Sequence, residues 1–598
     1  MTLQPQRGES VFHVVMIKPT HYDDEGYPIQ WLKSAMPSNT LACLNGLAED
    51  ARQRNLLGED VEIRLEAYDE TNQHVRPQQI VRRIRKAGGR ALITLVGVQS
   101  NQFPRAVDLA RPFLAAGLPV CIGGFHVSGC IAMLPEMPAE MREAQGLGIS
   151  FFAGEAEAGR LDEVLHDAWH GKLAPLYNYM DDLPPLESEP TPVLPPELVK
   201  RVDGWFSSMD LGRGCPYKCS FCTIINVQGH KSRFRSPDDL EKIVRANHAK
   251  DIHRFLITDD NFARNRNWEA LFDRLILLRK RDGLGVELTI QVDTQCHRIP
   301  GFIEKAGEAG VKHVFIGLEN INPDNLVAAR KPQNKITDYR TLLQQWRSQG
   351  VITLCGYILG FPADTKESIL RDIEIMKREL PLELVEFFIL TPLPGSQDHK
   401  VMLQQGAWMD PDLNKYDVNH RVTHHARMTD AEFDDAWYAA WKAYYTPEHM
   451  RTMLRRAAAN PRADMTLLAR LILAFSMSVA IEDVHPLESG IFRLKFRRDR
   501  RHGMKRENPL IFYPRYLGET LVKLSQYWLA NKRIRKVLDE IMEAPDRGSY
   551  SDIAITPSQE NEFDALELFQ ATRGGEAAVA RKRRDQSTRA AFARASQP

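Results

Sequence analysis

The chain has 598 residues, of which 43% are hydrophobic and 26% are charged, a composition typical of folded globular proteins and not of disordered chains. Lys plus Arg and Asp plus Glu both total 78, so no excess of positive charge indicates binding to nucleic acid. This length predicts three or four domains. Eight cysteines are too few for a disulfide framework in a chain of this size, which favours a reducing, cytoplasmic location.

The first part of the chain, residues 1–171, alternates strand and helix signals. Residues 1–10 are polar and lack the apolar core of a signal peptide. Residues 11–19 form a near-continuous apolar run, as expected for a strand that is covered on both faces. Further strands are predicted at 61–68, 91–98, 119–123 and 149–154, with helices between them. This order predicts a doubly wound parallel sheet of the flavodoxin-like or Rossmann class.

Glycines and polar side chains follow the later strands of this predicted sheet, at the edge where such sheets bind ligands. Gly123, Gly124 and His126 follow the strand at 119–123, and Gly154 and Glu155 follow the last strand. Glycine lets the backbone approach a flat ligand closely. A lone histidine at a strand end is more often a hydrogen-bonded structural residue than a ligand.

Residues 172–203 are rich in proline and acidic residues, which favours an extended linker. From residue 204 to 406, six strand–helix units follow and predict a (βα)6 partial TIM barrel, whose chemistry belongs at the C-terminal ends of the strands. A carboxylate at such an end can also cap the next helix. The polar residues and glycines at these ends include Asp259, Asp260, Glu319, Gly356 and Gly360.

Residues 407–556 have helical patterns and predict a third, all-α domain. Thr429 and Glu432 form a capping box at one helix start. Residues 467–481 are apolar but too few to span a bilayer and contain Arg470, so we expect a buried helix. The basic run at 493–506 is interpreted as a solvated face; the alternative is contact with an anionic substrate or with the surface of a membrane. The composition of residues 557–598 predicts a disordered tail.

Three cysteines, Cys215, Cys219 and Cys222, form a C-x3-C-x2-C pattern in the loop after the first predicted barrel strand. Thiolates are soft ligands that suit Fe–S clusters and zinc. A structural zinc site needs four ligands, and the other cysteines are isolated in the sequence, so zinc would have to recruit a residue such as His230. A [4Fe–4S] cluster held by three cysteines leaves one iron open to a small molecule, which suits catalysis.

This spacing, with Phe221 before the last cysteine, resembles the signature of the radical S-adenosylmethionine (radical SAM) superfamily, and the resemblance covers about residues 205–406. It implies that the three cysteines bind a [4Fe–4S] cluster and that S-adenosylmethionine binds the open iron. One electron, from a donor such as flavodoxin or ferredoxin, then cleaves S-adenosylmethionine to methionine and a 5′-deoxyadenosyl radical. The positions that match cofactor contacts are Phe221, Asp259, Asp260, Glu319, Gly356 and Gly360.

Residues 11–170 resemble the cobalamin-binding domain that precedes the catalytic domain in a large subgroup of this superfamily, on the strength of the GG-x-H and GE-x-E segments. The resemblance implies that Gly123, Gly124, His126, Gly154 and Glu155 lie at a cobalamin site. The D-x-H-x-x-G motif that supplies a lower axial histidine is incomplete, because no aspartate stands two residues before His126. We therefore expect no ligation of cobalt by histidine. A flavodoxin-like domain without a cofactor is the alternative.

Together these resemblances imply methyl transfer to an unactivated carbon of a small-molecule or lipid-like substrate. Two alternatives stay open: an oxidative cyclase or rearrangement enzyme of the anaerobic porphyrin cyclase type, and a non-catalytic Fe–S or zinc regulatory protein. Nucleic acid is not expected as a partner, because the net charge is zero and no RNA-binding barrel is recognisable.

Overall fold

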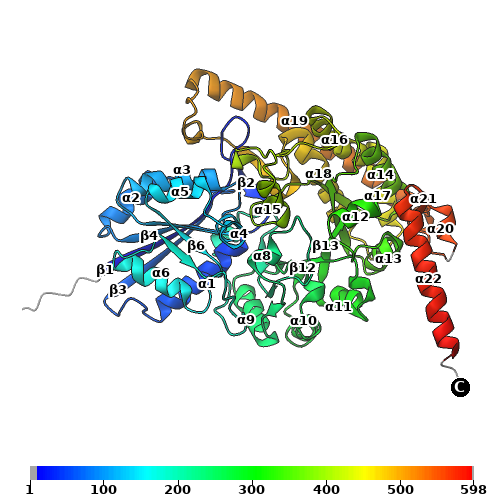
Figure 1. The fold of residues 1–598 in the computed structure, drawn as a ribbon, viewed down its shortest axis with the longest axis horizontal. Helices are drawn as coiled ribbons and strands as arrows, with labels where there is room; N and C mark the ends of the chain where they lie inside the picture. The colour runs from blue at the N-terminus through cyan, green and yellow to red at the C-terminus, as the bar shows by residue number, and fades with distance from the viewer. Residues whose placement is uncertain (1–9, 560, 596–598) are drawn as a thin grey trace, which may run out of the picture.

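The computed structural model describes residues 10–559 and 561–595. Residues 1–9, which belong to the polar N-terminal stretch for which the sequence predicts no signal peptide, therefore lie outside the described residues. Two parallel six-stranded sheets lie side by side, and helices of the C-terminal part cover the second sheet and extend beyond it (Figure 1). The buried apolar residues form large clusters inside both sheets and under these helices.

The first sheet is entirely parallel and has the strand order β3-β1-β4-β5-β6-β7. This order, with the second strand outside the first, is the flavodoxin-like arrangement, and it confirms the predicted doubly wound sheet. The strands are β1 (Ser10–Lys18), β3 (Val61–Asp69), β4 (Ala91–Leu95), β5 (Val120–Gly123), β6 (Ile149–Ala153) and β7 (Leu176–Asn178). The helices are α1 (Asn39–Gln53), α2 (Pro77–Lys86), α3 (Phe103–Leu114), α4 (Phe125–Met133), α5 (Ala139–Gly146) and α6 (Arg160–Trp169). Strand β7 comes from the segment that the sequence predicts to be a linker.

The second sheet is also parallel, with consecutive strands as neighbours and β8 and β15 at its two edges, so it is an open partial barrel, as predicted. The strands are β8 (Phe206–Met209), β11 (Arg254–Ile257), β12 (Glu287–Val292), β13 (Val311–Glu319), β14 (Ile352–Leu359) and β15 (Leu384–Ile389). Its helices are α8 (Ile224–Val227), α9 (Pro237–His248), α10 (Trp268–Asp282), α11 (Phe302–Ala309), α12 (Pro323–Ala328), α13 (Tyr339–Ser348), α14 (Lys366–Glu379) and α15 (Gln397–Gln404).

A short antiparallel pair brackets the cysteine loop. Strand β9 (Gly212–Arg213) pairs with β10 (Arg233–Phe234), so the loop with the cysteines leaves and re-enters the barrel through a narrow hairpin. Helix α9 follows β10 closely and begins at Ser236, whose hydroxyl caps the helix in a reciprocal pair with Asp239. The short α7 (Pro196–Val199) precedes the barrel.

The C-terminal part is helical, as the sequence predicts. Its helices are α16 (Asp430–Tyr444), α17 (Pro447–Ala458), α18 (Met465–Met477), α19 (Pro509–Glu543), α20 (Glu562–Ala565), α21 (Glu567–Gln570) and α22 (Arg573–Ala595). Helix α16 starts at the predicted capping box of Thr429 and Glu432. Among the described residues, one helical stretch, Met465–Glu482, is long and apolar enough to cross a membrane, and it packs between α17 and α19.

The tail from residue 557 onward differs from the predicted disorder, because α20, α21 and α22 form there. Phe563, Leu566 and Phe569 are buried, and α22 contacts α12 of the barrel. These few apolar residues are spread through a polar sequence, so composition averaged over the segment does not reveal that they share one buried side.

The basic run at 493–506 is not simply a solvated face. Its first residues belong to β16 (Gly490–Leu494), which pairs antiparallel with β2 (Gln30–Ser34) of the N-terminal part. Arg493 lies 3.0 Å from Asp23 and over the ring of Trp31, and Arg501 pairs with Asp412 at 2.6 Å. Part of this positive charge therefore joins the C-terminal segment to the first domain.

Candidate functional site

The three cysteines lie at the C-terminal end of β8, on the loop that β9 and β10 enclose. All three are free thiols; Cys219 is buried, and Cys215 and Cys222 are partly exposed. Burial raises the pKa of each thiol, to about 12 for Cys222. The protein alone therefore keeps these groups protonated, and a bound cation is needed to hold them as thiolates.

A single zinc ion would require the sulfur atoms of the three cysteines to lie close together. Tetrahedral zinc, with Zn–S bonds of about 2.3 Å, requires sulfur atoms about 3.8 Å apart. Among the described residues, Cys215, Cys219 and Cys222 do not form a set whose sulfurs all lie within 4.8 Å of one another. His230, the candidate fourth ligand, is exposed. The three sulfurs are therefore not arranged as a single tetrahedral zinc ion requires.

Two adjacent carboxylates follow β11 beside the cysteine loop. Asp259 is buried and accepts a hydrogen bond from Asn265 at 2.7 Å, whereas its second oxygen and one oxygen of Asp260 have no hydrogen-bond partner among the described residues. Burial raises the pKa of both carboxyl groups to about 7. A Cβ on Gly212 would lie 2.3 Å from Asp259 Oδ2, so glycine there makes room for the carboxylate. Unpartnered buried acceptors of this kind suit a ligand with N–H donors.

A buried ion pair at the end of β13 lies near Cys219 of the cysteine loop. Glu319, at the end of β13 and with φ of +62°, pairs with Lys331, whose Nζ also donates to Gly317 O at 3.2 Å. Burial raises the pKa of the Cys219 thiol, and the positive charge of Lys331 opposes that rise. Gln333 Nε2 lies 3.6 Å from Cys219 Sγ. Lys331 and Gln333 do not stand out in the sequence; the polar segment that follows α12 is the one signal near them.

The predicted glycines of β14 have packing reasons in the structure. A Cβ on Gly356 would lie 2.8 Å from a ring atom of Phe315, and a Cβ on Gly360 would lie 2.3 Å from the ring of Phe433 in α16. Phe221 packs against the small apolar cluster that contains Phe361. Contact of these residues with a nucleoside stays a prediction.

In the first domain, His126 lies in the first turn of α4, which begins directly after β5. Its ring is fully buried, with Nδ1 3.1 Å from Ser100 Oγ and the ring centre 4.5 Å from that of Phe103. Burial lowers its pKa to about 3, so the imidazole is neutral. These contacts are those of a hydrogen-bonded structural residue.

The loop after β1 contains a histidine that does not stand out in the sequence. His21 is buried, and its Nε2 lies 3.7 Å from an oxygen of Asp417 and 3.6 Å from an oxygen of Glu488. Two carboxylates from the C-terminal part of the chain therefore lie beside the first loop of the sheet.

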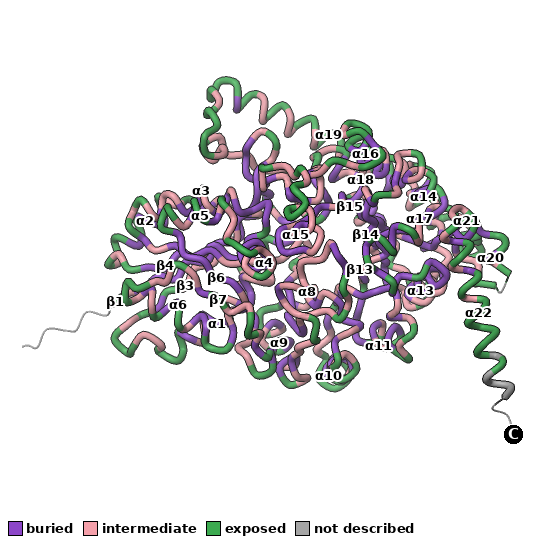
Figure 2. Tube along the Cα trace, in the orientation of Figure 1, coloured by how far each residue is buried: buried purple, intermediate pink, exposed green. Residues whose placement is uncertain are grey.

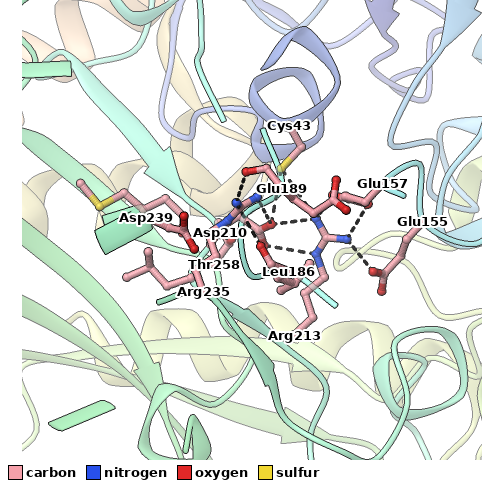
Figure 3. A network of polar contacts seen from close by, with 12 residues as sticks. Cys43, Glu155, Glu157, Leu186, Glu189, Asp210, Arg213, Arg235, Asp239 and Thr258 are labelled. Atoms are coloured by element: carbon pink, nitrogen blue, oxygen red, sulfur yellow. Dashed lines mark hydrogen bonds and ion pairs between the residues drawn. The ribbon is translucent and has the colours of Figure 1, made fainter. Parts of the chain in front are cut away.

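Glu155, predicted as a cofactor residue, belongs to a buried cluster of charges between the two sheets (Figure 3). Arg213 of β9 donates to Glu155 at 2.7 Å, to Glu157 at 2.6 Å and to Asp210 at 2.7 Å. Arg233 of β10 donates to Glu155 at 2.7 Å. The loop after β6 is thus fixed to the hairpin that carries the cysteines, two residues before Cys215. The sequence analysis missed both arginines.

A second contact between the domains is made by glycines. A Cβ on Gly129 of α4 would lie 2.8 Å from Cα of Gly395, in the loop after β15. Asn226, in the helix after the cysteines, donates to Gly395 O at 2.8 Å. Together with the arginine cluster, this contact places the carboxyl edge of the first sheet beside the mouth of the barrel.

The profile of the Radical SAM superfamily matches residues 209–376, a range that contains the three cysteines and the ends of β11, β13 and β14. The chain contains a radical SAM domain. It is an enzyme that uses S-adenosylmethionine and a [4Fe–4S] cluster.

The curated relatives of this radical SAM chain include methyltransferases. Bacteriochlorophyllide d C-8(2)-methyltransferase of Chlorobaculum tepidum is 26% identical over 408 residues, which are 65% of this chain and 84% of the relative. Hopanoid C-2 methylase of Rhodopseudomonas palustris is 24% identical over 385 residues, covering 61% and 70%. The apo structure of the cobalamin-dependent S-adenosylmethionine radical enzyme OxsB matches with a TM-score of 0.50 and 13% identity, over 96% of this chain and 84% of OxsB. The chain shares that fold along almost its whole length.

Proposed function

We propose that the chain is a cobalamin-dependent radical SAM methyltransferase that methylates an unactivated carbon of a small-molecule or lipid-like substrate. The observation that carries this proposal is the joint between the sheets: Arg213 ties the carboxyl edge of a flavodoxin-like sheet to the hairpin of the cysteines. A flat cofactor at that edge would face the barrel mouth. The names of the curated relatives, which include two carbon methyltransferases, support methyl transfer.

When bound, the cluster with S-adenosylmethionine supplies a carbon radical, and cobalamin supplies a methyl group. Cys215, Cys219 and Cys222 would hold the cluster, and an external donor such as ferredoxin or flavodoxin would reduce it. The free oxygens of Asp259 and Asp260 would accept hydrogen bonds from the amino group of S-adenosylmethionine. Burial of this site between the two sheets would keep water from the radical.

The first test is Cys219→Ala in the full-length protein after anaerobic reconstitution with iron and sulfide. We expect the loss of most bound iron and of the reductive cleavage of S-adenosylmethionine, because a ligand of the cluster is removed. Cys121→Ala is the matched control, since this buried thiol lies on β5 of the first sheet, away from the motif. Iron content and cleavage that both survive in Cys219→Ala would refute the assignment of the cluster.

The second test concerns cobalamin and methyl transfer separately. Titration of the reconstituted protein with hydroxocobalamin should shift the visible spectrum of the corrin and saturate. If no corrinoid binds, the cobalamin part of the proposal fails while the radical SAM assignment stands. With a candidate substrate and S-adenosylmethionine that is deuterated in its methyl group, a methyltransferase transfers the label, whereas an oxidative cyclase gives an unlabelled product.

A further inference from the structure

One face of α19 exposes several large apolar side chains that the proposed reaction does not use. Figure 1 shows the first half of α19 extending away from the other C-terminal helices, and Figure 2 shows that most of this segment is exposed. Leu510 is 82% exposed, and Leu517, Leu521 and Trp528 are each about 60% exposed. Large apolar side chains that are exposed together in this way usually mark an interaction surface.

The spacing of these residues puts them on one side of the helix. Residues three, four and seven apart share a helical face, and Ile511, Val522 and Leu529 widen it. Leu510 and Trp528 are 18 positions apart, so the stripe is about 27 Å long. The stripe consists of Leu510, Tyr513, Leu517, Leu521, Leu524 and Trp528.

The opposite side of α19 is the one that packs on the protein. Phe512 is buried, with its ring centre 5.4 Å from that of Tyr27. Tyr516 donates to Arg493 O at 2.9 Å, and Lys523 pairs with Glu482 at 2.6 Å. The helix thus presents its apolar side to solvent, which is the reverse of a helix that covers a globular core.

Positive charge lies at both ends of the stripe. Within residues 509–531 the one acidic residue is Glu519, which lies on the packed side, about half a turn from the line of Leu517 and Leu521. An exposed helix with Leu, Trp and Tyr on one side and Lys and Arg around it is typical of helices that lie in a membrane interface. The exposed basic residues are Lys505 and Arg506 before the stripe and Lys532, Arg533, Arg535 and Lys536 after it.

We propose that this face of α19 binds the surface of an anionic membrane, with the apolar stripe at the boundary between headgroups and acyl chains and the basic residues on the headgroups. A second copy of the chain is a weaker occupant, because a symmetric pairing of the stripe would bring two sets of like charges together. The inference concerns a surface and stands independently of methyl transfer; it provides a route by which the enzyme could reach a lipid-like substrate.

The experiment is cosedimentation of the full-length, reconstituted protein with vesicles of phosphatidylcholine, with and without phosphatidylglycerol. We expect binding to the anionic vesicles that weakens as salt is added. The double variant Leu517→Asp/Leu521→Asp should weaken binding at least about tenfold, because two charges enter the apolar stripe. The matched control, Leu147→Asp/Leu403→Asp, changes two exposed leucines on α15 and at the end of α5 and should bind as the wild type does.

A second pair of variants tests the charges. Lys532→Gln/Lys536→Gln should weaken binding to anionic vesicles several-fold and make it less sensitive to salt. Circular dichroism checks that each variant is folded. The absence of binding to anionic vesicles, or equal binding to neutral ones, overturns the proposal. A dimer in sedimentation velocity that Leu517→Asp/Leu521→Asp converts to a monomer, without vesicle binding, would assign the face to a second copy instead.

Discussion

The backbone conformation of Gly124 and the loop after β4 leave no room for a side chain at this position. Its φ is +146°, and a Cβ there would lie 2.2 Å from the backbone nitrogen of Val98. Gly124→Ala should lower the free energy of unfolding by about 2–4 kcal/mol, from backbone strain together with the collision. Gly146→Ala is the control, because no atom lies within 4 Å of its Cβ position; it should change stability by less than about 1 kcal/mol. Urea unfolding measures both, and equal effects would contradict the steric argument.

Lys331 is a buried residue of the candidate site that no pattern in the sequence indicates. Lys331→Met would leave Glu319 buried without its partner, which costs about 3–5 kcal/mol in comparable buried pairs. We expect lower stability and slower uptake of iron, since the cation that opposes the raised pKa of Cys219 is lost. Lys335→Met, four residues on and exposed, is the control. Unfolding curves and the time course of iron uptake during reconstitution test this; an unchanged time course would exclude a role for Lys331 at the cluster loop.

At this scale the sequence identifies residues whose role follows from local spacing and misses those whose partner is distant in sequence. The three cysteines are recognisable because their pattern spans eight residues. Lys331 and Cys219 are more than a hundred residues apart, so no local pattern connects them. For Gly360 the position was predicted, but the nearby ring of Phe433 comes from a helix that only the fold brings there.

Among the elements, the hairpin of β9 and β10 determines how the cysteine loop meets the first sheet. Arg213→Met would leave Glu155, Glu157 and Asp210 as buried carboxylates without their central cation. We expect the free energy of unfolding to fall by about 3–5 kcal/mol and the segment 172–203 to become more sensitive to proteases, because the joint between the sheets is lost. Arg54→Met removes a partly exposed pair with Asp162 and should cost less than about 1 kcal/mol. Equal costs would show that the buried cluster does not stabilise the joint.

Periodicity predicts most of the helices and the long parallel strands, because the pattern of apolar residues within each element shows which of its faces is buried. It does not predict β7, β9, β10 or the pair of β2 and β16, since these strands are short and are defined by a partner elsewhere in the chain. Strand β16 shows this most clearly: its basic residues predict a solvated face, and its pairing with β2 buries Arg493 against Asp23 instead.

At the scale of the whole molecule, His420 makes a pH-dependent contact between the loop after β1 and the C-terminal part. Burial lowers the pKa of His420, but hydrogen bonds to Asp24 and Asp417, at 3.1 and 2.8 Å, outweigh this and raise it to about 10. The unfolded value is about 6.5. The folded state thus binds the proton more tightly, so the stabilisation is complete below about pH 6.5 and is lost as the pH rises through about 10.

The prediction is a comparison of His420→Gln with the wild type across that range. The wild type should be more stable by about 1–3 kcal/mol near pH 6, and the difference should shrink toward pH 10. His166→Gln changes an exposed histidine on α6 and should show no such trend. Urea unfolding at a series of pH values measures the difference, and a gap that stays constant with pH would rule out the charged joint.

The sequence predicts two sheets and a helical part but not how they sit against one another. Their placement depends on pairs such as Gly129 with Gly395 and Arg213 with Glu155, whose members look ordinary in isolation. The position of the first sheet over the barrel therefore becomes visible in the structure and not in the pattern of the chain.

The pairing of β2 with β16 has a consequence for synthesis. The two strands are separated by more than 450 residues. At about 5–20 residues per second, the ribosome therefore needs roughly 25–90 s between the synthesis of β2 and the synthesis of β16. During that time the N-terminal domain has a strand edge without its partner and a loop without its covering carboxylates. Completion of this domain is therefore a late event that waits for the synthesis of residues 490–494, and a nascent chain arrested before residue 490 should recruit chaperones at β2.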